Sequence, residues 1–171
     1  MRFALLLFTL ASLLFAKIDS FKTIQSDFVQ KVTNDQNKTI VYQGVFYATH
    51  DKKALWIYDK PVEKKIYFNE TRVLIIEPEL EQVIITTLEN TPNIAQLLQE
   101  AKEISTNTYV TKFMETTYTI LANTHGIEKV LYKDKLDNSV EILFSNQSTN
   151  LFLDDTLFKA DIPKGYDIIR E

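Results

Sequence analysis

Apolar and polar side chains alternate along much of the chain, and a period of two is typical of β-strands. The first clear run begins at Phe28, with Gln30 and Val32 on the same side of the strand. Residues 34–37 are polar and predict a turn, and residues 39–49 are again rich in β-branched and aromatic side chains. The sequence therefore predicts a β-hairpin.

Further strand-like runs follow at short spacing, separated by polar residues. They cover Ala54–Tyr58, Lys64–Phe68, Arg72–Ile76, Gln82–Leu88, Thr108–Met114, Thr117–Ala122, Ile127–Lys133, Ser139–Phe144 and Thr156–Ala160. Many short strands with polar turns indicate an antiparallel sandwich or barrel. The sequence has no internal repeat, linker or low-complexity segment, so we expect one domain.

Two segments have helical spacing instead. A short one carries Ile18, Phe21 and Ile24 and suits one or two turns. A longer one begins where Thr91 offers an N-cap and Pro92 a first helical position. Its apolar side chains are Ile94, Leu97, Leu98, Ala101 and Ile104. This pattern predicts an amphipathic helix that buries one face.

Two of the predicted strands are apolar on both faces. Residues 73–76 and 83–85 are uninterrupted apolar runs, although neighbouring side chains of a strand point to opposite sides. Both faces therefore need cover. A central strand of a two-layer core is one explanation, and the other is a sheet whose second apolar face forms a ligand cavity roofed by helices.

Residues 1–16 have the features of a secretory signal peptide. Arg2 precedes an almost entirely apolar run at 3–15, which is shorter than the roughly 20 residues of a membrane-spanning helix. We expect cleavage after Ala16 and a single exported domain of residues 17–171.

The composition narrows the classes of function. The 171 residues include 19 basic and 23 acidic side chains, and the net charge of −4 argues against nucleic-acid binding. The absence of cysteine excludes disulfides, thiolate metal sites and a lipidated N-terminal cysteine. The 3 glycines lie far apart, so the sequence has no phosphate-binding loop.

Candidate catalytic groups are few. His50 and His125 lie far apart and carry no metal-binding or nucleophile motif, so we expect no metal, no cofactor and no enzymatic activity. Alternate glutamates in residues 77–81 could supply paired carboxylates for glycosidic chemistry. Pro78 lies among them, however, and favours a solvated turn.

Residues 35–39 contain an Asn-x-Thr acceptor at Asn37, in the predicted hairpin turn, with Asp35 two positions earlier. Bacterial oligosaccharyltransferases favour an acid at that position, so Asn37 is a candidate glycosylation site. Asn69 and Asn146 begin similar triplets that lack the acid. Chance occurrence is the alternative explanation.

A set of short motifs occurs in a fixed order along the chain. They lie at 28–32, at Gly44, at 56–61 (Trp-Ile-Tyr-Asp-Lys-Pro), within 74–83 (Glu-Pro-Glu-Leu-Glu-Gln-Val), at 90–92 (Asn-Thr-Pro) and at 158–166 (Phe-Lys-Ala-Asp-Ile-Pro-Lys-Gly-Tyr). Together, from about Ile18 to Asp167, they resemble the LolA family of periplasmic outer-membrane lipoprotein carriers.

This resemblance implies a mainly β (α+β) fold. We expect a single strongly curved antiparallel sheet that forms an unclosed half-barrel, with its concave apolar face lidded by short helices. The cavity would hold the acyl chains of a lipoprotein. The implied partners are acylated lipoproteins, an inner-membrane ABC exporter and an outer-membrane acceptor lipoprotein. We expect a monomer, and the absence of cysteine favours the soluble carrier over the lipid-anchored acceptor.

The resemblance also assigns side chains to the cavity and its lid. By strand alternation and the family pattern they are Ile18, Ile24, Phe28, Phe46, Ala48, His50, Trp56, Tyr58, Ile66, Phe68, Val73, Ile75, Val83, Ile85, Ile94, Leu97 and Leu98. His50 falls where the family has an arginine that ties the sheet to the lid. We therefore expect His50 to form a weaker, pH-sensitive latch, or else to be an ordinary polar residue at a strand end.

Two other functions stay open. A periplasmic sensor domain could bind a lipoprotein or another apolar ligand on the same kind of sheet. An exported enzyme acting on glycans would need a cleft with a shifted carboxylate, for which the sequence offers only residues 77–81.

Overall fold

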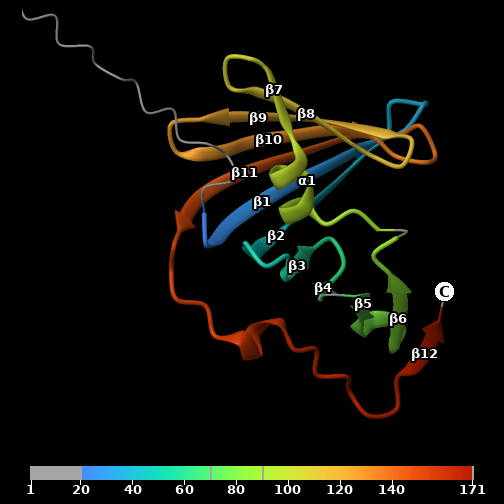
Figure 1. The fold of residues 1–171 in the computed structure, drawn as a ribbon. Helices are drawn as coiled ribbons and strands as arrows, with labels where there is room; N and C mark the ends of the chain where they lie inside the picture. Colours follow the sequence, from blue (N-terminus) through green and yellow to red (C-terminus); the bar gives the residue numbers. More distant parts are fainter. Residues whose placement is uncertain (1–20, 70, 90, 171) are drawn as a thin grey trace, which may run out of the picture.

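The computed structural model describes residues 21–69, 71–89 and 91–170. In these segments twelve strands form one sheet, which curves around a single short α-helix (Figure 1). The strands are β1 (Thr23–Thr33), β2 (Thr39–Thr49), β3 (Ala54–Lys60), β4 (Lys64–Phe68), β5 (Arg72–Glu77), β6 (Gln82–Thr87), β7 (Lys102–Ser105), β8 (Thr108–Phe113), β9 (Thr116–Asn123), β10 (Gly126–Lys133), β11 (Ser139–Thr149) and β12 (Asp167–Arg170). The helix is α1 (Ile94–Glu100), and the 3-10 helices are η1 (Pro78–Leu80) and η2 (Asp155–Phe158).

The sheet is open. Its strand order is β12-β6-β5-β4-β3-β2-β1-β11-β10-β9-β8-β7, so β12 and β7 are edges that do not pair with each other. Neighbouring strands run antiparallel, except that β12 lies parallel to β6. The curved, unclosed sheet is confirmed, and the parallel edge strand is an addition to the expected topology.

The helix differs from the prediction at both ends. Asn93, not Thr91, is the N-cap, and its side-chain oxygen accepts a hydrogen bond from the Ala95 amide at 3.0 Å. The helix ends at Glu100, and Ile104 lies exposed in β7. Residues 102–105, which include the last predicted helical turn, instead pair with β8 as the strand β7.

Two further sequence predictions were wrong. The helical spacing at 18–24 does not produce a helix at Ile24, which lies in β1 and pairs with β2 and β11, while Ile18 lies outside the described residues. The run at 156–160 is not a strand, because the Asp154 side chain caps η2 by accepting from the Thr156 amide at 2.8 Å.

The sheet has an apolar cluster on each face. The α1 helix lies inside the curve of the sheet, and the C-terminal segment that carries η2 runs along its outer side (Figure 1). The concave cluster joins the sheet to α1, and the convex cluster joins it to η2. The buried members of the concave cluster are Phe21, Ile24, Phe28, Phe46, Ala48, Ala54, Trp56, Tyr58, Phe68, Val73, Ile94, Ala95, Leu97, Leu98, Tyr109, Tyr118, Ile120, Ala122, Ile127, Val130, Val140, Ile142 and Phe144. Those of the convex cluster are Leu55, Tyr67, Ile76, Val83 and Phe158.

The two clusters explain why some strands are apolar on both faces. In β5, Val73 packs in the concave cluster, whereas Ile76 packs in the convex cluster. Ile76 pairs with Val83, so Val83 and Ile85 lie on the convex side rather than in the expected cavity. Their orientation was predicted wrongly because the register of β6 is set by η1, which the alternation pattern does not reveal.

Candidate functional site

A cavity of about 190 Å³ lies between α1 and the concave face of the sheet. Side chains from both halves of the curved sheet and from the α1 segment enclose it. The lining residues are Gln30, Trp56, Tyr58, Ile66, Phe68, Thr91, Pro92, Ile94, Leu97, Tyr118, Val130, Tyr132 and Ile142. Because most of these are apolar or aromatic, the cavity suits an apolar ligand.

Aromatic rings pack together on the concave face and form a wall, of which Trp56 lines the cavity. The Phe28 ring centre lies 4.8 Å from that of Trp56 in an edge-to-face arrangement, and the Phe46 ring centre lies 4.4 Å from that of Trp56. These rings come from β1, β2 and β3, whose alternation points the same side of each strand into the concave face. The wall is therefore rigid and apolar.

One end of this wall is polar. The Tyr58 hydroxyl donates to the Gln30 side-chain oxygen at 2.9 Å, and the Lys64 amine lies 4.6 Å from the Tyr58 ring centre. Burial raises the pKa of Tyr58, so its hydroxyl stays protonated, and burial lowers the pKa of Lys64. This end places hydrogen-bonding groups and a partly desolvated cation beside the apolar space.

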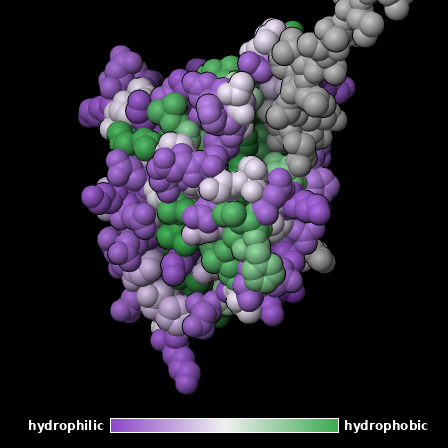
Figure 2. Space-filling view, turned by 90° about the vertical axis from the view of Figure 1, so that its left-hand side faces the viewer, coloured by the Kyte–Doolittle hydropathy of each residue, from purple (hydrophilic) through white to green (hydrophobic). Residues whose placement is uncertain are grey.

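A second hollow, of about 390 Å³, adjoins the cavity. The two share Pro92, Tyr118 and Tyr132 as lining residues, and the second adds Phe113 of β8 and Met114 of the β8–β9 turn. Met114 is 59% exposed, so apolar surface extends from the interior toward the turn. On the face of the molecule shown in Figure 2, apolar patches interrupt a mostly hydrophilic surface.

Two side-chain amides of the α1 segment tie it to the β2–β3 turn. The Asn93 side-chain nitrogen donates to the Lys52 carbonyl at 2.6 Å, and the Gln99 side-chain nitrogen donates to the His50 carbonyl at 2.7 Å. We call these two bonds the amide latch. The remaining contacts of α1 with the concave cluster are made by apolar side chains, which can exchange one apolar partner for another.

The turn that receives the amide latch is held in place by side-chain contacts. The Thr49 hydroxyl donates to the Asp51 carboxylate, and the Lys53 amine pairs with Asp51 at 3.3 Å and with Asp155 of η2 at 2.9 Å. The Thr49 hydrogen bond, followed by Lys53, lowers the pKa of Asp51, which keeps its carboxylate charged. The latch therefore closes onto a fixed turn.

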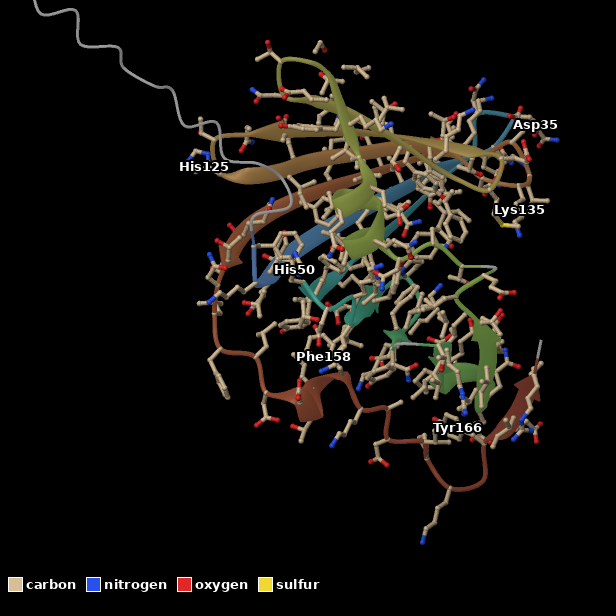
Figure 3. All side chains as sticks on the ribbon, viewed as in Figure 1. Asp35, His50, His125, Lys135, Phe158 and Tyr166 are labelled. Carbon is tan, nitrogen blue, oxygen red and sulfur yellow. The ribbon has the colours of Figure 1, made fainter. Side chains whose placement is uncertain are left out.

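His50 lies in this turn beside α1 (Figure 3). Its side chain is exposed, and its carbonyl contributes to the amide latch by accepting from Gln99. Its backbone amide donates to the Lys22 carbonyl at 2.8 Å. The position that we expected to tie sheet and lid together does so through main-chain atoms. A role for its imidazole stays a prediction.

The structure brings most of the predicted cavity residues together. The concave cluster contains Ile24, Phe28, Phe46, Ala48, Trp56, Tyr58, Phe68, Val73, Ile94, Leu97 and Leu98, and Ile66 and Ile75 pack against it. Tyr118 of β9 and Val130 and Tyr132 of β10 also line the cavity and were not among the predicted residues. Alternation in those strands carried the signal, since Tyr118 and Ile120 lie on one side.

The acidic run at 77–81 forms a turn, as expected. Residues 78–80 are η1, and the Glu77 carboxylate accepts from the Gln82 side chain at 2.6 Å. Among the described residues no cluster of three or more histidine or acidic side chains could hold a metal ion. None of the helices in the described segments has the length and apolar character needed to cross a bilayer.

Comparison with known proteins identifies the family. Residues 19–125 match the family model described as outer membrane lipoprotein carrier protein LolA. The outer-membrane lipoprotein carrier protein of Campylobacter jejuni is 39% identical over 166 residues, which is 97% of each chain. The corresponding protein of Wolinella succinogenes is 38% identical over 173 residues, covering 100% of both chains.

Solved structures show the same fold at low sequence identity. A LolA superfamily protein from Nitrosomonas europaea aligns with a TM-score of 0.56 at 10% identity, over 84% of this chain and 94% of that one. An uncharacterised conserved protein from Thermus thermophilus aligns with a TM-score of 0.56 at 11% identity, over 90% and 93% of the two chains. From its fold, its sequence relatives and its family match, the chain belongs to the LolA family.

Proposed function

We propose that the protein is a periplasmic carrier of acylated lipoproteins, acting by binding rather than by catalysis. It takes lipoproteins from an inner-membrane ABC exporter, shields their acyl chains under α1 and delivers them to the outer membrane or to an acceptor there. The observation that carries this proposal is the apolar cavity closed by a short helix. Its membership of the LolA family and the names of its relatives support the same function.

The size of the cavity bears on how cargo is held. Ligand pockets usually enclose about 300–1,000 Å³, whereas this one has about 190 Å³. Acyl chains therefore need α1 to move away from the sheet. Burial stabilises by about 0.8 kcal/mol per methylene, so three long chains gain tens of kcal/mol on leaving water. The lost contacts of Ile94, Leu97 and Leu98 offset part of that gain and allow release.

The sequence outside the cavity supports export and free movement. Residues 1–16 have the pattern of a signal peptide, and we propose that cleavage after Ala16 releases residues 17–171 into the periplasm. The sequence contains no cysteine, so it offers no attachment point for an N-terminal lipid anchor. A carrier that crosses the periplasm must not be anchored to a membrane.

Trp56, the single tryptophan of the chain, provides a direct test because it lies in the cavity wall. Titration with a triacylated lipopeptide should change its fluorescence and saturate at one lipopeptide per protein, whereas the same peptide without acyl chains should give no change. Equal responses to the two peptides would contradict acyl-chain binding at this site.

A matched pair of variants locates the binding further. Ile66→Phe fills part of the cavity and should weaken lipopeptide binding about tenfold, or about 1.4 kcal/mol. Ile57→Phe adds the same atoms on the convex side, where Ile57 packs against the convex cluster, and should bind as the wild type does. If both variants bind alike, the cavity under α1 is not the site.

A further inference from the structure

The sequence holds three Asn-x-Ser/Thr triplets, and their surroundings in the structure differ. They begin at Asn37, Asn69 and Asn146. An acid stands two positions before Asn37, whereas Tyr67 and Phe144 stand there in the other two. Both of these aromatic side chains are buried. Asp35, by contrast, is exposed in the β1–β2 turn.

The β1–β2 turn presents Asn37 to solvent. Asn34 organises the turn: its side-chain oxygen accepts from the amides of Gln36 at 3.0 Å and Lys38 at 2.9 Å, and its carbonyl accepts from the Asn37 amide at 3.0 Å. Asn37 is exposed, with a left-handed φ of 59°. Within the described residues, its carboxamide makes no hydrogen bond, so the nitrogen that a glycan would modify is accessible.

The other two asparagines are occupied by structural contacts. The Asn69 side-chain oxygen accepts from the Arg72 amide at 3.0 Å and shapes the β4–β5 turn. The side-chain nitrogen of Asn146, in β11, donates to a carboxylate oxygen of Asp27, in β1, at 2.7 Å. Modification of Asn146 would break this charged hydrogen bond, and reaching Asn69 would disturb a turn that closes two strands.

We propose that Asn37 is an N-glycosylation site, modified after export by an oligosaccharyltransferase that reads residues 35–39. The co-substrate is an oligosaccharide carried on a polyprenyl pyrophosphate. The Asn37 amide nitrogen forms a bond to the anomeric carbon of the first sugar while that carbon's bond to the pyrophosphate oxygen breaks. The polyprenyl pyrophosphate leaves, and the amide proton passes to a base of the transferase.

The position of the site is compatible with cargo binding. Asp35 lies at the outer end of the β1–β2 hairpin, at the opposite end of the sheet from His125 (Figure 3). Neither Asp35 nor Asn37 lines the cavity under α1 or the adjoining hollow. A glycan on Asn37 therefore leaves α1 and its amide latch free to move.

The test is transfer in vitro to the folded, mature protein. A purified bacterial oligosaccharyltransferase and its polyprenyl-pyrophosphate oligosaccharide are the probes, and intact mass with peptide mapping is the readout. We expect one added glycan per chain, located on Asn37. Asn37→Gln should abolish the added mass, while Asn69→Gln and Asn146→Gln should keep it.

Two pairs of variants test whether the transferase recognises Asp35 and Thr39. Asp35→Asn and Thr39→Val should each lower the extent of modification at least tenfold, whereas Asp35→Glu and Thr39→Ser should retain it. Thr39→Val also removes the 2.9 Å hydrogen bond between the Thr39 and Thr33 hydroxyls, so its melting temperature is measured alongside. An unmodified Asn37, or a glycan on Asn69 or Asn146 instead, would overturn the proposal. The mass readout is independent of lipoprotein carriage.

Discussion

Gly44 illustrates how a single residue shapes the packing of neighbouring strands in the sheet. A Cβ atom at this position would lie 1.8 Å from the Ile57 carbonyl oxygen and 3.0 Å from the Phe28 ring. The ladder between β2 and β3 shifts register at Gln43 and Gly44, and Phe28 of β1 pairs with Gly44 from the other side. Glycine therefore allows β3 and the Phe28 ring to approach the same point of β2.

Replacement of Gly44 tests this packing. Gly44→Ala forces the β3 backbone away and should lower the free energy of unfolding by about 3 kcal/mol, measured by urea denaturation. Gln43→Ala, at the exposed neighbouring position, is the control and should change it by about 0.5 kcal/mol or less. Similar losses in the two variants would mean that the close approach at Gly44 is not important for stability.

At the residue scale, the alternation of apolar and polar side chains correctly predicted which residues face the concave side in long, regularly paired strands. Phe28, Phe46 and Trp56 all lie in the concave cluster. The prediction failed at Val83, because the left-handed Glu81, with a φ of 48°, closes η1 and fixes which side of β6 faces inward. The pattern of apolar residues does not reveal that Glu81 adopts a left-handed conformation, so the sequence alone could not predict the register of β6.

At the scale of elements, α1 is held by two kinds of contact with different consequences for cargo. Its apolar face packs in the concave cluster, where acyl chains can take its place. The amide latch consists of hydrogen bonds, which need a fixed geometry and would break when α1 moves away from the sheet. A net hydrogen bond contributes about 1 kcal/mol, so the latch biases α1 toward closure without preventing it from opening.

Gln99→Met tests the latch because it removes the donor and keeps the size and neutrality of the side chain. It should lower the free energy of unfolding by about 1 kcal/mol. Because acyl chains enter only when α1 moves away from the sheet, weakening the closed state should also raise the affinity for a triacylated lipopeptide. The expected increase is about fivefold, which is about 1 kcal/mol expressed as a ratio of dissociation constants. Urea denaturation and Trp56 fluorescence measure the two effects.

His50→Ala is the control for that experiment. It removes the imidazole and keeps the carbonyl that accepts from Gln99, so the free energy of unfolding should match that of the wild type. A change in the pH profile of cargo release in this variant would show that the ring takes part in the latch. Unchanged affinity in Gln99→Met would contradict the role of the amide.

A carboxylate on β11 joins three strands on the outer surface. Glu141 contacts Lys129 of β10 at 2.9 Å and Lys31 of β1 at 3.3 Å. The hydrogen bond from Lys129, followed by that from Lys31, lowers the pKa of Glu141. Because the pKa is lower in the folded state, this stabilisation is present above the unfolded value of about 4.3 and is lost as the pH falls through the folded value.

Glu141→Gln should therefore destabilise the protein in a pH-dependent way. At pH 7 we expect a loss of about 1 kcal/mol or less, the usual contribution of partly exposed ion pairs, and at pH 3 we expect a smaller loss. Urea denaturation at the two pH values measures the difference. A loss that is equal at both would assign the effect to packing instead of charge.

The elements themselves were largely predictable, and their ends were not. The boundaries of β4 agree with the alternation pattern, but α1 starts at the Asn93 cap, and β7 and β12 were missed. Both missed strands have four residues and are exposed at sheet edges, so they show little apolar alternation. The start of α1 depends on the hydrogen bond of its N-cap, and β7 and β12 depend on pairing with the neighbouring strand at each edge of the sheet.

At the scale of the whole molecule, the two apolar clusters divide stability and function between the faces of the sheet. The convex cluster includes Phe158 of η2, and η2 also contacts the β2–β3 turn through the Lys53–Asp155 ion pair. The concave cluster includes the face of α1, which cargo must displace. Acyl-chain binding as proposed would therefore rearrange the concave cluster and leave the residues of the convex cluster in contact.

The central claim is that the concave face carries acyl chains, and one measurement tests it most directly. Energised spheroplasts, stripped of their own carrier but containing the cognate exporter, are incubated with and without the mature protein, and released triacylated lipoprotein is quantified. We predict a soluble complex of one lipoprotein with one carrier, and release that is reduced by Ile66→Phe. Lipoprotein that stays in the inner membrane despite added folded protein would contradict the account.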